Sequence, residues 1–153
     1  MAATVTVSQV RAQLAALCLQ IAGIVTAYAE APNSLNATDM PTVVILPGAV
    51  SEGEYRGEDY HTEIREYRIL LYVTPRGAGL PGEGERLLSP FFDLLHDFFL
   101  ARPSLGGLNG VMKAEWGGDG GSAILTYNDT PYLGIDAKIS VETVSEIVYA
   151  TLE

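Results

Sequence analysis

The chain has 153 residues, the usual length of a single folded domain, and a globular composition that is 48% hydrophobic and 18% charged. Its net charge of −10 argues against binding to nucleic acid or to an anionic membrane, because both attract clusters of basic residues and only two lysines are present. No apolar run approaches the ~20 residues of a membrane-spanning helix. We expect no signal peptide, and the single cysteine, Cys18, excludes an internal disulfide.

The N-terminal segment predicts a helix. Thr6, with Gln9 three residues later, has the pattern of a capping box, and apolar residues then recur at helical spacing from Val10 to Tyr28, over five turns. A polar loop, APNSLNATD, follows. The run PTVVILPG then predicts a short buried strand over Thr42–Leu46.

The middle of the chain predicts an acidic loop, a long strand and a linker. SEGEYRGEDY is expected to be a loop that carries four carboxylates, at Glu52, Glu54, Glu58 and Asp59. HTEIREYRILLYVTP alternates as a strand does, and both of its faces become apolar near its end, which predicts that the sheet is covered on both sides there. The glycine-rich residues 76–85 are expected to form a mobile linker.

The stretch LLSPFFDLLHDFF predicts a second helix over residues 87–99. When residues are counted at ~100° each around a buried face centred on Phe91, Asp93 and His96 point to solvent. The residues expected on the buried face are Leu87, Leu88, Leu94, Leu95 and Phe98, with Phe92 and Phe99 at its edge.

The C-terminal third predicts three more strands. GVMKAEW and GSAILTY are expected to be two strands joined by a turn at GGDGG, and NDTP forms a second turn. YLGIDAKISVETV is the clearest strand, with Leu133, Ile135, Ala137, Ile139 and Val141 directed inward. The order α, β, β, α, β, β, β predicts one domain over residues 1–153 with an α+β fold: a mainly antiparallel β-sheet with two amphipathic helices packed on one face.

Asp93, His96 and Asp97 are the candidates for a chemical site, because carboxylates and imidazole at helical spacing can bind a metal ion from one side. The sequence supplies no obvious third ligand, and a solvated helix face explains the same residues. Leu100, expected on the same outer face, suggests a protein contact. The acidic loop lacks the EF-hand pattern for calcium and the glycine-rich stretches lack a phosphate-binding motif, so no cofactor is expected.

The whole order of elements resembles the tail-terminator (tail-completion) proteins of long-tailed phages and prophages. The resemblance lies in the PTVVILPG strand, the sequence pattern LLYVTP…G…LLSPFFDLL, the Arg-Pro-x-Leu that ends the second helix, and the strand YLGIDAKISV. It implies an α+β subunit of a hexameric ring that caps the finished tail tube, stops its polymerisation and presents a surface to the head connector.

The resemblance further implies a location in the virion tail or neck after assembly in the host cytoplasm. The implied partners are other copies of the chain, the major tail-tube protein and the head–tail connector or stopper. Genomic DNA would pass through the ring without specific binding. Residues expected to contact a subunit or partner are Glu52, Glu54, Glu58, Asp59, Arg76, Asp93, His96 and Leu100. The loops 50–60, 76–85 and 117–122 are expected to order on assembly.

Two alternatives stay open. The chain could form a different neck ring, such as a head–tail stopper. It could instead belong to another class, a small metal-dependent enzyme that uses Asp93, His96 and Asp97. The resemblance implies no catalytic residue, and we expect the chain not to be an enzyme.

Overall fold

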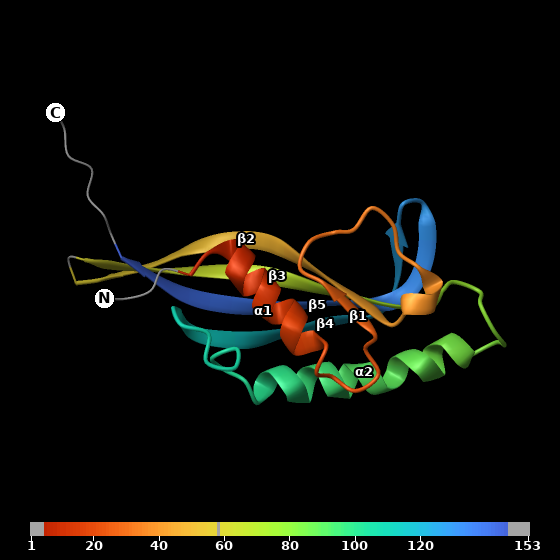
Figure 1. Ribbon diagram of the computed structural model, residues 1–153. Coiled ribbons are helices and arrows are strands. Elements are labelled where there is room, and N and C mark those ends of the chain that lie inside the picture. Colours follow the sequence, from red (N-terminus) through yellow and green to blue (C-terminus); the bar gives the residue numbers. More distant parts are fainter. Residues whose placement is uncertain (1–4, 58, 147–153) are drawn as a thin grey trace.

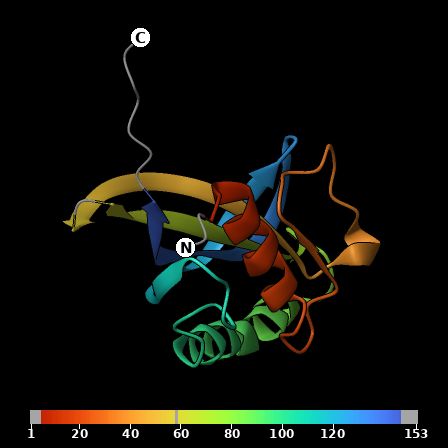
Figure 2. The same cartoon turned by 60° about the vertical axis from the view of Figure 1, so that its left-hand side comes forward.

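The computed structural model describes residues 5–57 and 59–146, without the side chains of residues 52–56 and 146. The elements in chain order are α1 (Val7–Cys18), β1 (Thr26–Tyr28), the short 3-10 helix η1 (Ala37–Asp39), β2 (Thr42–Arg56), β3 (Tyr60–Pro75), α2 (Glu83–Leu100), β4 (Val111–Tyr127) and β5 (Thr130–Glu146). The strands form one sheet in the order β1-β2-β3-β5-β4, antiparallel except for the β1–β2 pair. Both helices pack on one face of this sheet, which confirms the α+β prediction (Figure 1, Figure 2).

Helix α1 begins as predicted and ends earlier. The Thr6 hydroxyl accepts a hydrogen bond from the Gln9 amide at 3.1 Å, and the Gln9 side chain accepts one from the Thr6 amide at 2.8 Å, which completes the capping box. The predicted continuation to Tyr28 is wrong. Gly23 has φ of +94°, outside the helical region, and the β-branched residues after it lead into β1.

The predicted acidic loop is the distal part of a long β-hairpin. Strand β2 runs on through Arg56, which pairs with Tyr60 of β3, so the sheet extends well beyond the predicted strand. Register shifts after Pro47 and after Glu52 interrupt the pairing. The backbone pairing of the hairpin therefore overrides the loop-like composition of this segment.

The two predicted strands around GGDGG are a single strand, β4. Its pairing with β5 shifts register on both sides of Asp119, and Gly118 and Gly121 adopt positive φ of 90° and 81°. These glycines thus allow β-bulges and do not form a turn. The predicted turn at NDTP is confirmed, since Asn128 and Asp129 have φ of 47° and 65°, as in a tight two-residue hairpin loop.

The main core lies between the helices and the sheet, and it corrects the predicted face of α2. The α2 side chains that are buried there are Leu88, Phe91, Leu95 and Phe99. This face is rotated by about 45° from one centred on Phe91. Leu87 is therefore 51% exposed, contrary to the prediction, whereas Phe99, predicted at the edge, stacks on Trp116 with ring centroids 5.8 Å apart.

A smaller core on the opposite face confirms that the end of β3 is covered on both sides. Its buried residues are Val44, Leu70, Tyr72 and Tyr132. The segment between β1 and β2 and the curled tip of the β4–β5 hairpin cover it (Figure 1, Figure 2). The Tyr127 hydroxyl donates a hydrogen bond to the Pro32 carbonyl and joins the two covering segments.

Candidate functional site

The outer face of α2 carries the predicted Asp93, His96 and Asp97, and all three are exposed, as predicted. His96 Nδ1 lies 3.0 Å from Asp97 Oδ1, a pairing between chain neighbours on the helix surface. Within residues 5–57 and 59–146, no group of three or more His, Cys, Asp or Glu side chains is placed to hold a metal ion. Leu100 is 63% exposed on the same helix and therefore available for a contact.

The predicted acidic contact residues are described only in part. Asp59 is exposed where β2 turns into β3. Glu58 lies outside the described residues, as do the side chains of Glu52 and Glu54, although the backbone of these two belongs to β2. The hairpin places this acidic sequence at one end of the sheet, far along the strands from the start of α2 (Figure 1).

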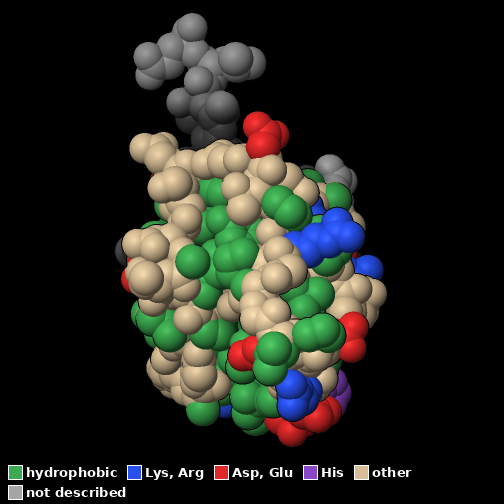
Figure 3. Space-filling model, turned by 90° about the vertical axis from the view of Figure 1, so that its right-hand side faces the viewer, with side chains coloured by type: hydrophobic (Ala, Val, Ile, Leu, Met, Phe, Trp, Pro, Cys, Tyr) green, Lys and Arg blue, Asp and Glu red, His purple; other side chains and the backbone are tan. Residues whose placement is uncertain are grey.

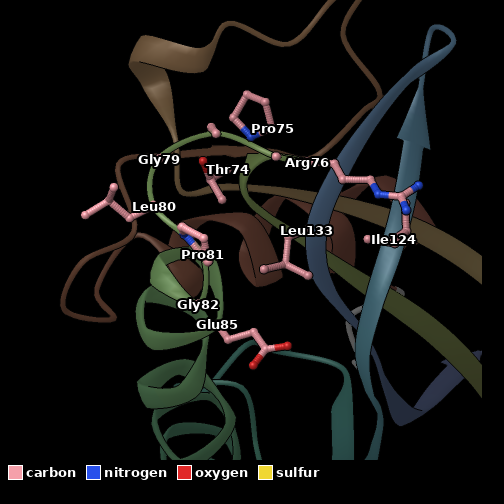
Figure 4. Close-up of a pocket in the computed structure, with 13 residues that line it drawn as sticks. Thr74, Pro75, Arg76, Gly79, Leu80, Pro81, Gly82, Glu85, Ile124 and Leu133 are labelled. Atoms are coloured by element: carbon pink, nitrogen blue, oxygen red, sulfur yellow. The ribbon is translucent and has the colours of Figure 1, made fainter.

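A hollow of about 420 Å³ lies at the other end of the sheet, and the sequence did not predict it. Its walls come from the end of β3, the segment 76–82, the first turn of α2 and the β4–β5 hairpin (Figure 4). Its apolar lining includes Leu80, Pro81, Ile124 and Leu133. Leu80 is 72% exposed and Ile124 47%, so the hollow is open to a partner.

Basic residues flank this hollow. Arg76 lines it and reaches toward Ile124 in Figure 4, whereas Arg86 lies beside Leu80 in an adjoining depression. Neither guanidinium has a hydrogen-bond or ion-pair partner within the described part of the chain. The Glu85 carboxylate borders the same hollow. Figure 3 shows hydrophobic side chains over much of this end of the molecule, with both basic and acidic side chains among them.

The segment 76–82 is held in place by local bonds. Its first residue, Arg76, donates its backbone amide to the Pro131 carbonyl at 3.0 Å, which ties the segment to the β4–β5 hairpin. The Leu80 amide donates to the Glu83 carboxylate at 2.8 Å, as at a helix N-terminus. The predicted linker is therefore shorter than residues 76–85, because α2 already begins at Glu83.

Other reactive groups have structural roles. Cys18 is fully buried in the main core, and burial raises the pKa of its thiol to about 12, so the thiolate needed for nucleophilic chemistry does not form near neutrality. On the face of the sheet opposite the helices, Arg68 of β3 and Asp136 of β5 form an ion pair, with 2.6 Å between the closest nitrogen and oxygen. This hydrogen-bonded pairing raises the pKa of Arg68 further, so the residue remains a cation.

Both lateral edges of the sheet lack a full-length strand partner within the described residues, although the Ala114 amide of β4 donates to the Pro103 carbonyl. On one side β1 covers only Thr42–Val44 of β2. The rest of that strand has no outer strand partner, although the Arg11 side chain of α1 donates to the Ile45 carbonyl at 3.0 Å. On the other side the outer edge of β4 has no strand partner along its length. The two edges belong to different strands and have different sequences, so any contacts they make with neighbours differ as well.

No helix in the described part of the chain is long and apolar enough to span a membrane. In the comparisons with known proteins, no protein-family model and no curated protein sequence matches the chain.

Proposed function

We propose that this protein is a structural subunit of a phage virion that forms a ring, expected to be a hexamer, on the end of the tail tube. The ring would stop tube polymerisation and join the tail to the head connector. The observation that supports a ring best is the sheet with two different open edges, on β2 and on β4. A ring built by head-to-tail contacts requires two different surfaces on opposite sides of each subunit.

The charge of the chain supports the same proposal. A subunit with a net charge of −10 gives an acidic ring, and DNA inside such a ring is repelled and free to slide. Exposed leucines at Leu80, Leu87 and Leu100 provide apolar surface for neighbours. The proposed activity is therefore assembly, with no reaction assigned to Asp93, His96 or Asp97.

The test is an assembly reaction with the major tail-tube protein from the same genome as this chain. Tube subunits polymerise with and without the purified protein, and tube lengths are measured by negative-stain electron microscopy. We expect tubes of limited length with a ring at one end, and unlimited growth in the reaction without the protein. Rings that bind head connectors but leave tube growth unchanged would instead identify a stopper, and a protein that binds neither would overturn the proposal.

A further inference from the structure

We propose that the free edge of β4 at Ser122–Thr126, together with the adjoining hollow, binds residues 147–153 of a second copy of this chain as an added strand. The proposal deepens the ring function and rests on it for the presence of a neighbouring copy. Three observations carry it: the direction of the edge amides, the apolar hollow beside them, and the distance that separates the hollow from the end of β5 in the same subunit.

The hairpin geometry determines which backbone groups are free. Tyr127 pairs with Thr130 across a two-residue loop, so the backbone amide and carbonyl groups of these two residues hydrogen-bond to each other. In an antiparallel pair, every second residue of β4 then hydrogen-bonds to β5, and the residues between them do not. Ser122, Ile124 and Thr126 consequently direct their amide and carbonyl groups away from β5. These groups face the outer edge, where no described strand pairs with them. An extended segment can therefore bond there, as in β-strand addition.

The hollow gives such a segment a place for its side chains. Ile124 pairs with Leu133, and both line the hollow on the helix side of the sheet. A strand added beside Ile124 directs alternate side chains to that side. Those side chains would meet Leu80 and Pro81, which form the opposite wall (Figure 4). The geometry thus requires an extended segment with apolar residues at alternate positions.

Residues 147–153, with the sequence Ile-Val-Tyr-Ala-Thr-Leu-Glu, have this chemistry. The segment is rich in β-branched and apolar residues, and it contains no proline or glycine that would disfavour a strand. Its single charged side chain is Glu153, which complements the guanidinium of Arg76 at the hollow, on the side away from the Glu85 carboxylate that borders the first turn of α2. Sequence and charge therefore select this segment among the apolar runs of the chain.

The segment cannot reach the hollow of its own subunit. Glu146 pairs with Tyr60 at one end of the sheet, whereas Leu133 lies in the hollow at the other end, thirteen positions earlier in β5. That separation is about 43 Å along the strand at 3.3 Å per residue. Seven extended residues span at most about 25 Å. A second copy, placed beside the β4 edge, is therefore the source of the added strand.

Disulfide trapping tests the proposal on the full-length protein, since buried Cys18 does not compete. Ile124→Cys protein is mixed with Leu152→Cys protein under mild oxidation, both in solution and on capped tail tubes. The matched control replaces Ile124→Cys with Met112→Cys, because Met112 is similarly exposed at the other end of β4. We expect a covalent dimer in the first mixture. We expect none in the control mixture, and none when the Ile124→Cys or the Leu152→Cys protein is oxidised alone.

Two results would overturn the docking proposal: equal dimer yields in the test and control mixtures, or no dimer in either setting. An internal disulfide in a monomer that carries both substitutions would also overturn it. These outcomes are separate from the ring function. If the protein caps tubes but forms no such dimer, the proposed function stands and the added strand is refuted. If the dimer forms but no tube is capped, the added strand stands and the proposed function is refuted.

Discussion

Two adjacent leucines in α2 give the sharpest test of how this helix packs. Leu88 is 1% exposed within the main core, whereas Leu87 is 51% exposed on the outer surface. Truncation of a buried leucine removes its transfer free energy and leaves a cavity, so Leu88→Ala is expected to lower the free energy of unfolding by about 3 kcal/mol. Leu87→Ala creates no cavity and is expected to change it by less than about 0.5 kcal/mol.

Urea unfolding at a concentration where the protein is monomeric measures this difference. The single tryptophan, Trp116, stacks on Phe99 and reports the loss of the core by fluorescence. The two variants should have the same dependence of stability on urea as the parent, so that midpoints can be compared directly. Equal losses for Leu87→Ala and Leu88→Ala would mean that the buried face is centred on Phe91, as the sequence pattern predicted, and would refute the observed packing.

Three further predictions concern the sheet and its second core. Gly134→Ala should destabilise the fold by at least ~3 kcal/mol, because an added Cβ overlaps the Leu71 carbonyl, whereas Gly120→Ala has room and should fold normally by circular dichroism. Burial raises the pKa of Tyr72 from 10 to about 12, so the stability that depends on its neutral phenol is complete below pH 10 and is lost as the pH rises toward 12. Tyr72→Phe should reduce this loss, measured as the change of the unfolding midpoint with pH. An unchanged pH dependence in the variant would contradict the assignment. Tyr127→Phe removes the bond to the covering segment and should cost about 1 kcal/mol in thermal unfolding, with no change counting against that bond.

Local signals predicted the beginning of α1 better than its end. The capping box of α1 involves residues three apart, and its geometry follows from the sequence alone. The end of α1 does not, because apolar residues continue at helical spacing beyond Gly23 and the same residues serve the turn and β1. Glycines 118 and 121 were similarly ambiguous, since a bulge within a paired strand and a turn between strands both require positive φ.

The buried face of α2 and the hollow depend on partners distant in sequence. The exposed positions of Asp93 and His96 followed from helical periodicity, whereas the burial of Leu88 over Leu87 depends on where the sheet meets the helix. The hollow combines residues near 80 with residues near 130, and no local pattern joins them. The only sequence signal was the isolated Leu80 in a glycine-rich segment, which reads equally well as part of a linker.

Imaging of the purified protein by electron microscopy over a series of concentrations, alone and with tail tubes, tests the ring proposal most directly. We expect closed rings, either free or formed at the end of a tube, because each subunit has two different sheet edges for head-to-tail contacts. The resemblance to tail terminators sets the expected number of subunits at six. A protein that stays monomeric at every concentration and never binds a tube end would contradict it.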